Sequence, residues 1–158
     1  MDGRAIIRRV DQVTSQLTPE QSHFIGMLRS GEIEQARNKL RDRDAMCCLG
    51  VMCESFRIQT GSGRWYGDVF IFGDNEDQFI GMPPVEVVQF FFGPDDDAIY
   101  VDGNEADPWI ARNFSGKEEG ATSANDEYKY SFDKIADLFE SAFQGVLLEI
   151  EDEEPDED

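Results

Sequence analysis

The sequence lacks any long hydrophobic run, and this absence excludes whole classes of protein. No stretch approaches the roughly 20 apolar residues that a membrane-spanning helix needs. The opening segment, MDGRAIIRRVDQ, also lacks the uninterrupted apolar core of a secretory signal. We therefore expect a protein of the cytoplasm that does not insert into a membrane.

Cysteine and histidine are scarce as well. The three cysteines all lie within residues 47–53, and His23 is the single histidine. An odd, clustered set does not build a disulfide framework, and adjacent Cys47 and Cys48 could bridge only with severe strain. Cysteine is among the residue types most often buried. We interpret the cluster as core packing, and we expect no catalytic residue, no metal and no cofactor.

Basic residues are few: 14 Lys and Arg stand against 34 Asp and Glu, a formal net charge of −20. The imbalance is uneven, because residues 1–60 carry nine basic and eight acidic side chains, residues 61–150 carry five and nineteen, and residues 151–158 carry none and seven. A surface of this sign repels nucleic acid and anionic membranes and attracts basic proteins. We expect no direct binding to either, but a partner protein that itself binds nucleic acid is compatible with the charge.

The chain does contain enough apolar material for one folded domain. Hydrophobic residues make up 40% of it, including twelve phenylalanines, and 158 residues is close to the usual size of a single domain. The end of the chain, EDEEPDED, has nothing to bury and its charges repel one another. The sequence predicts a single domain over residues 1–150 and a disordered acidic tail over residues 151–158.

The spacing of apolar residues predicts a helical N-terminal half. Helices are expected over residues 5–17, 18–30, 32–42 and 45–56. The second has the clearest start, because Thr18, Pro19 and Gln21 form a capping signature. Gly50 lies inside the last helix, where glycine costs up to about 1 kcal/mol relative to alanine. This position indicates that another element approaches the helix backbone closely.

From residue 64 the pattern changes to strands. Segments 64–73 and 77–82 are rich in aromatic and β-branched residues and predict a hairpin, and segment 98–103 predicts a third strand. A short helix is expected over residues 84–93.

The remaining segments complete the predicted fold. Residues 103–130 are interpreted mostly as loop, with one helical turn around Trp109. Residues 131–148 carry a continuous apolar stripe and predict a long C-terminal helix. The predicted fold is α+β, with a helical N-terminal half, a small antiparallel sheet and a long C-terminal helix.

Several short motifs occur in the order found in a family of small, uncharacterised proteins of tailed phages and prophages. They are LRSGEIEQARNKLR, CCLGVMCE, GRW, MPPVEVVQFF and ANDEYKYSFDKIADLFE. The second, residues 47–54, resembles the "CCLGVLCD"-like segment of that family, and the similarity spans about residues 23–141. The acidic middle, residues 95–128, and the tail depart from the family pattern. The resemblance implies a phage origin and a shared small fold, and it transfers no catalytic residue.

The acidic residues indicate a possible imitation of DNA. DNA carries one negative charge per about 1.7 Å of its axis, and carboxylates gathered on one protein face could imitate that row. Aromatic residues among them could act as anchors for a partner. The predicted partner-binding residues are Asp68, Asp74, Glu76, Asp77, Asp95, Asp96, Asp97, Asp102, Glu105, Asp107, Glu118, Glu119, Trp65 and Trp109.

The sequence therefore favours a non-enzymatic, phage-encoded accessory protein of the host cytoplasm. It would bind and inhibit a basic host protein that binds nucleic acid, for host takeover or against host defence. A virion-associated structural or decoration protein is one alternative. A small metal protein or enzyme using Cys47, Cys48, Cys53 and His23 is another. An acidic surface that only keeps the chain in solution is a further explanation.

Overall fold

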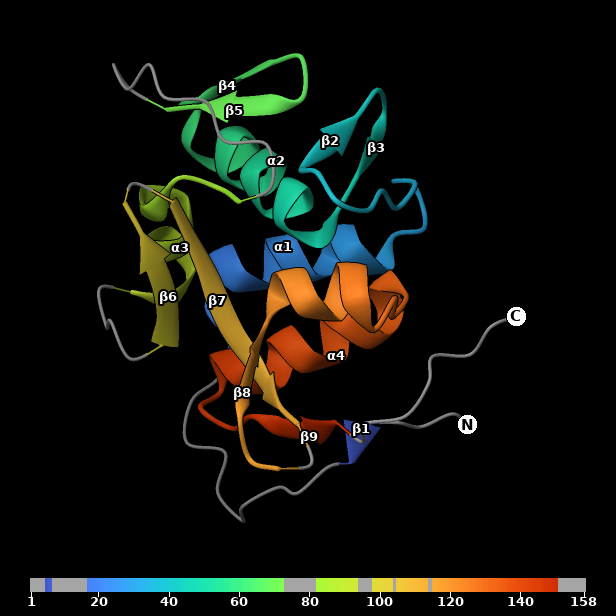
Figure 1. The fold of residues 1–158 in the computed structure, drawn as a ribbon. Helices are drawn as coiled ribbons and strands as arrows, with labels where there is room; N and C mark the ends of the chain where they lie inside the picture. Colours follow the sequence, from blue (N-terminus) through green and yellow to red (C-terminus); the bar gives the residue numbers. More distant parts are fainter. Residues whose placement is uncertain are drawn as a thin grey trace.

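The computed structural model describes residues 5–6, 17–72, 82–93, 98–103, 105–113 and 115–150. It confirms an α+β fold (Figure 1). The α-helices are α1 (Pro19–Arg29), α2 (Cys48–Thr60), α3 (Val85–Phe92) and α4 (Phe132–Phe143). A π-helical segment, η2 (Ser123–Glu127), precedes α4.

The strands form one larger sheet and two small hairpins. The strands are β1 (Ala5–Ile6), β2 (Arg41–Asp42), β3 (Ala45–Met46), β4 (Arg64–Tyr66), β5 (Val69–Ile71), β6 (Ile99–Asp102), β7 (Glu105–Arg112), β8 (Glu118–Gly120) and β9 (Leu148–Ile150). The larger sheet has the order β1-β9-β7-β6, and β8 also pairs with β7. All of its pairs are antiparallel except β7 with β9.

The core lies where α1, α2, α3 and α4 meet the inner face of β7. Helix α2 is buried over most of its circumference, and Phe24 of α1 packs edge-on against Phe139 of α4 with ring centroids 4.8 Å apart. Gly50 explains the tight fit of α2, because a Cβ there would lie 2.9 Å from the carbonyl carbon of Leu40 and closer still to its oxygen. The predicted packing reason for Gly50 is therefore confirmed.

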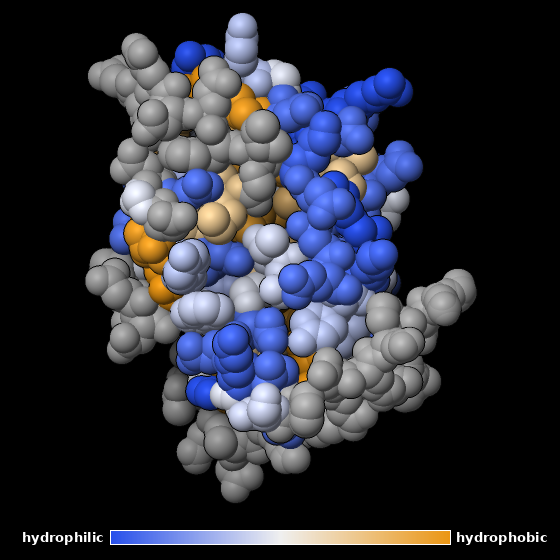
Figure 2. Space-filling view, in the orientation of Figure 1, coloured by the Kyte–Doolittle hydropathy of each residue, from blue (hydrophilic) through white to orange (hydrophobic). Residues whose placement is uncertain are grey.

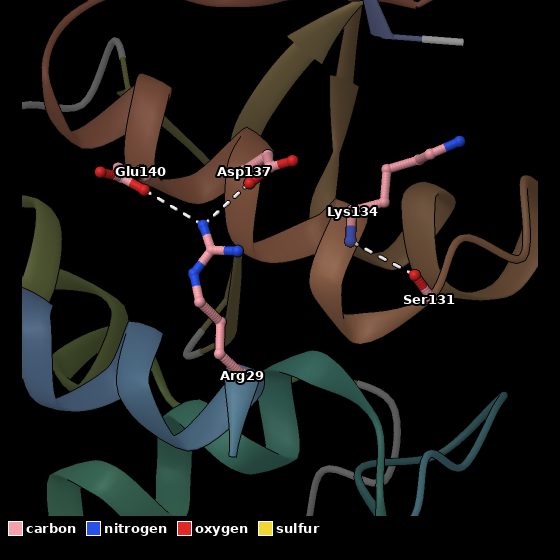
Figure 3. Close-up of polar contacts among 5 residues, drawn as sticks. All are labelled: Arg29, Ser131, Lys134, Asp137 and Glu140. Atoms are coloured by element: carbon pink, nitrogen blue, oxygen red, sulfur yellow. Dashed lines mark hydrogen bonds and ion pairs between the residues drawn. The ribbon is translucent and has the colours of Figure 1, made fainter. Parts of the chain in front are cut away.

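Locally encoded elements agree with the sequence prediction. Helix α1 begins at the predicted capping box, in which the Thr18 hydroxyl accepts from the N–H of Gln21 and the Gln21 side chain accepts from the N–H of Thr18. Helices α2 and α3 and strand β6 lie within their predicted ranges or a few residues from them. On the outside, Arg29 of α1 reaches Asp137 and Glu140 of α4 and ties the two helices together (Figure 3).

Two predictions for the N-terminal half are wrong. Residues 32–42 are not a helix, because the N–H of Ala36 donates to the carbonyl of Met46 (2.8 Å) and the N–H of Met46 donates to that of Glu34 (2.9 Å). This pairing holds the segment extended beside the β2–β3 hairpin. Residues 5–6 form β1 on the edge of the sheet, so the helix predicted over 5–17 does not begin there. Residues 7–16 lie outside the described part.

Three predictions for the rest of the chain also need correction. The first hairpin closes at Gly67, within residues 64–71, rather than pairing segment 64–73 with 77–82, most of which lies outside the described residues. Residues 103–130 are not mostly loop, because they contain β7, β8 and η2. The C-terminal helix is shorter than predicted: it ends at Phe143, and Gly145 (φ 93°) turns the chain into β9.

The predicted acidic tail lies outside the described residues. Among those that are described, none of the helices combines the length and the apolar character that crossing a membrane requires.

Candidate functional site

The β6–β7 hairpin presents one face to the core and the other away from it. Along β7, Ala106, Pro108 and Ile110 are buried, whereas the alternating residues between them are only partly buried. Register pairs Tyr100 with Asp107 and Ile99 with Pro108. Because directly opposed residues of an antiparallel pair share a face, Tyr100 lies on the side opposite the core. We call the set Tyr100, Glu105, Asp107 and Trp109 the β6–β7 face.

Two aromatic rings meet on the β6–β7 face. The rings of Tyr100 and Trp109 pack edge to face, with centroids 6.0 Å apart. Tyr100 is 47% exposed, and Trp109 is partly buried. Figure 2 shows the side of the molecule on which β6 and β7 lie in front, with an apolar group of atoms over β6 at the left edge. An exposed aromatic ring that is braced by a second ring is an ordered surface for contact.

Asp107 is the most unusual charged group of this face. Its carboxylate lies against Gly120 of β8, where a Cβ would stand 2.5 Å from Oδ2. The backbone N–H of Thr122 donates to Oδ1 (3.2 Å). Burial raises the pKa of Asp107 to about 6 despite this hydrogen bond, and the negative charge of Asp126 acts in the same direction. Glycine at position 120 is what allows a carboxylate to occupy this place.

A buried asparagine fixes the segment that covers Asp107. Asn125, which is 1% exposed, accepts hydrogen bonds through Oδ1 from Gln35 Nε2 (2.8 Å) and from the N–H of Cys48 (3.3 Å). Its Nδ2 donates to the carbonyl of Ala36 (2.9 Å). The π-helical segment is thereby tied to the helical half of the protein, so the position of Thr122 over Asp107 is set by a buried network.

The chemistry of the β6–β7 face suits a cation. Aromatic faces attract ammonium and guanidinium groups, and carboxylates bind them through charge-assisted hydrogen bonds. Tyr100 and Trp109 supply the rings, and Glu105 lies on the same side of the hairpin. The carboxylate of Asp107 is buried beneath Gly120 and Thr122 and adds its negative charge from below the surface. A face of this composition is able to bind lysine or arginine side chains.

The structure brings together three of the predicted partner-binding residues, Glu105, Asp107 and Trp109. The backbone register places a fourth, Asp102, opposite Glu105. Tyr100 completes the face and was missed by sequence reasoning. A signal for it exists, because Tyr100 lies two residues before Asp102 in a predicted strand, and residues two apart share a face.

The other predicted acids lie elsewhere or outside the described residues. Asp68 pairs with Lys39 (3.1 Å), and Glu118 pairs with Arg112 (3.9 Å). Glu119 accepts from Asn113 Nδ2 (2.9 Å). The predicted residues that fall outside the described part are Asp74, Glu76, Asp77, Asp95, Asp96 and Asp97.

Trp65 belongs to a different part of the surface and has contacts of its own. Its Nε1–H donates to Glu54 (2.8 Å), and its ring packs edge-on against Phe70. The guanidinium of Arg41 lies over the ring, 5.1 Å from its centroid. These contacts hold the β4–β5 hairpin on α2, so Trp65 acts as a structural residue of the helical half.

The cysteines behave as core residues. Cys47, Cys48 and Cys53 are all buried and unpaired. Burial raises the pKa of Cys47 to about 12 and raises the pKa of Cys48 and of Cys53 as well. Thiols of this kind are poor nucleophiles, because the thiolate is the reactive form.

His23 does not join the cysteines. Its Nδ1 lies 2.7 Å from the hydroxyl of Ser55, which is fully buried. Within the described ranges, no three side chains of His, Cys, Asp or Glu are grouped so that they could hold a metal ion.

The fold and the face define an α+β domain whose β6–β7 hairpin carries an exposed tyrosine packed against a tryptophan. The chain belongs to the family described as Domain of unknown function (DUF8296), whose model matches residues 20–143. The matched region begins in α1, ends with the last residue of α4 and includes the whole β6–β7 face. No curated protein and no solved structure matches the chain.

Proposed function

We propose that this protein binds a basic, nucleic-acid-binding host protein through the β6–β7 face and inhibits it, as a non-enzymatic accessory protein of phage origin. The observation that carries the proposal is the convergence of Tyr100, Glu105, Asp107 and Trp109 on one side of a hairpin. The phage origin and the host cytoplasm rest on the motif resemblance, and the inhibition rests on the DNA-like charge.

The distribution of charge supports a basic partner. Residues 17–72 carry seven basic and seven acidic side chains, whereas residues 82–150 carry four and fifteen. The acidic excess therefore belongs to the half of the domain that contains the β6–β7 face. Complementary charge accelerates association and selects partners of opposite sign, and both effects weaken as salt rises.

The aromatic pair supports selectivity beyond charge. Tyrosine and tryptophan dominate binding energy in many protein interfaces, because they bury a large area and lose little conformational entropy. Tyr100 is exposed enough to contact a partner and is already braced by Trp109.

A pull-down from host lysate with two matched variants tests this proposal. Tyr100→Ser removes an exposed ring from the face, and Tyr66→Ser removes an equally large, 66% exposed ring from the β4–β5 hairpin. We expect the wild type and Tyr66→Ser to retain the same basic protein at about 0.1 M salt and to lose it at about 0.5 M. Loss of a central tyrosine costs about 1–2 kcal/mol, so Tyr100→Ser should retain it about tenfold more weakly.

Competition completes the test. Added duplex DNA should displace the captured protein if the acidic chain occupies its nucleic-acid site. Equal retention by both tyrosine variants would reject the β6–β7 face as the binding surface. A partner that stays bound at high salt would contradict the electrostatic basis of the proposal.

A further inference from the structure

Strand β6 lies at the edge of the larger sheet. Among the described residues it pairs with β7 on one side and with nothing on the other. An edge strand exposes a row of unpaired backbone N–H and C=O groups, which can pair with a strand from another chain.

The register shows which backbone groups point away from the sheet. The N–H of Ala106 donates to the carbonyl of Pro83 (3.1 Å) and therefore points away from β6. Val101 is its partner in register. In an antiparallel ladder, hydrogen-bonded and non-hydrogen-bonded pairs alternate, so Val101 and Ala106 form a non-hydrogen-bonded pair. The N–H and C=O of Val101 consequently face the open edge.

The β6 edge has only some of the features that protect exposed edges. Natural edge strands are short or carry charged residues, proline or a bulge; β6, which reads Ile99-Tyr100-Val101-Asp102, is short and ends in an acid, but it has no lysine or proline and pairs without a break in register. Tyr100 is 47% exposed and Val101 is 43% exposed. In the described part of the chain only two other large apolar side chains, Ile58 and Tyr66, are exposed. The apolar atoms over β6 in Figure 2 mark this edge.

We propose that the β6 edge binds an extended, lysine- or arginine-containing segment of the partner as an additional strand of the sheet. This inference rests on the proposed function and names the form of partner that the site accepts. Side chains on one face of the added strand would lie beside Tyr100. Their positive charge would match the acidic excess of residues 82–150, which carry fifteen acidic and four basic side chains.

The charge of the domain favours an extended basic segment at the β6 edge over a second copy of the chain and over nucleic acid. A second copy of the chain, paired edge to edge through β6, would bring together two regions that each carry fifteen acidic and four basic side chains, and like charges brought together are destabilising. Nucleic acid has no peptide backbone for the ladder and carries the same sign of charge. An extended basic segment satisfies the backbone groups and has the charge opposite to that of this part of the chain.

Two peptides and two variants of the full chain test the inference. The probe is a fluorescent ten-residue peptide of alternating lysine and threonine, and its control is the same peptide with alternate backbone nitrogens methylated. Val101→Pro removes the outward N–H, whereas Val101→Thr keeps it. We expect the wild type and Val101→Thr to bind the probe within twofold of each other at about 0.1 M salt. Backbone methylation and Val101→Pro should each weaken binding at least tenfold.

The outcomes separate this inference from the proposed function. Equal, salt-sensitive binding of the methylated and unmethylated peptides would overturn strand addition and leave a basic partner in place. No binding of either peptide at about 0.1 M salt would overturn both proposals. If Val101→Pro fails to fold by circular dichroism, the comparison of the two peptides on the wild type still decides the question.

Discussion

The two halves of this domain use charge in different ways. Over residues 17–72 basic and acidic side chains are equal in number, and Lys39 pairs with Asp68 and Arg57 with Glu54. Residues 82–150 carry nearly four acids for each base. A net charge of −20 is therefore no uniform property of the surface. Charge is balanced in the helical half, residues 17–72, and the negative charge is concentrated in the sheet half, residues 82–150.

The largest expected change in stability tests how tightly the helical half is packed. Gly50→Ala places a methyl group against the backbone of Leu40, which cannot move aside as a side chain could. We expect a loss of about 3 kcal/mol or more in the free energy of unfolding, or failure to fold. Gly26→Ala is the matched control, since its Cβ would meet nothing within 4 Å, and it should stabilise helix α1 by about 0.5–1 kcal/mol. Urea denaturation measures both, and similar values would contradict the packing argument.

The next effect tests whether the two halves unfold together. Asn125→Ala leaves Gln35, the N–H of Cys48 and the carbonyl of Ala36 without their shared partner. Unsatisfied buried groups cost about 1–3 kcal/mol each, with partial relief by rearrangement. We expect a total loss of about 2–4 kcal/mol in one cooperative transition. Two separate transitions, seen by circular dichroism and by tryptophan fluorescence, would show that the halves are independent.

Replacing Asp107 is expected to raise the stability of the protein, by less than the losses predicted for Gly50 and Asn125. Because the folded-state pKa of Asp107, about 6, is above its usual 3.8, the folded protein binds the proton more tightly than the unfolded chain does. Stability from this group is therefore greatest at low pH and is lost as pH rises through about 6. Asp107→Asn keeps an acceptor for Thr122 without the buried charge, so it should stabilise the protein by about 1–3 kcal/mol at pH 7.5.

The pH dependence supplies the control for this variant. At pH 4.5 Asp107 is protonated in the folded protein but mostly ionised in the unfolded chain, so the stabilisation by the variant should be clearly smaller than at pH 7.5 and should disappear only below the usual pKa of 3.8. A destabilised Asp107→Asn at pH 7.5 would mean that the negative charge is needed to hold the Thr122 segment. Stabilisation with weakened peptide binding would mark Asp107 as a residue that is kept for binding at a cost in stability.

The smallest effects concern the cap of α4 and the ion pairs that join α1 to α4, which Figure 3 shows. Ser131 caps α4 by accepting from the N–H of Lys134 (3.3 Å), and Ser131→Ala should cost about 1 kcal/mol. Arg29 bridges Asp137 and Glu140, but these side chains are 37%, 60% and 42% exposed. Exposed ion pairs contribute at most about 1 kcal/mol. We expect Arg29→Met to cost less than Ser131→Ala, and only its effect should shrink at 1 M salt.

Local signals predicted the elements that depend on neighbouring residues. The capping box of α1 and the proline and glycine that bound α3 act over a few positions, and the structure places both helices where these signals occur. Strand β7 was missed because Asp107 and Pro108 are atypical of strands. Its pairs with β6, β8 and β9 come from segments before and after it in the chain, and single-sequence patterns do not report such pairing.

The candidate face could be predicted only in part for the same reason. Charge and aromatic character identified Glu105, Asp107 and Trp109 as residues, but their common side depends on a strand that the sequence did not reveal. The raised pKa of Asp107 depends on Gly120 and Thr122, which approach through the β7–β8 pairing. Residue type alone therefore points to candidates, whereas their assembly requires the register of the sheet.

The two edge strands of the larger sheet differ in length, and this difference determines how many added strands one chain can bind. At one edge lies β1, a strand of two residues that pairs with β9. At the other edge, within the described residues, β6 has no second neighbour. The two residues of β1 offer less backbone for pairing than the four residues of β6. Complexes formed at β6 should therefore saturate at one segment per chain.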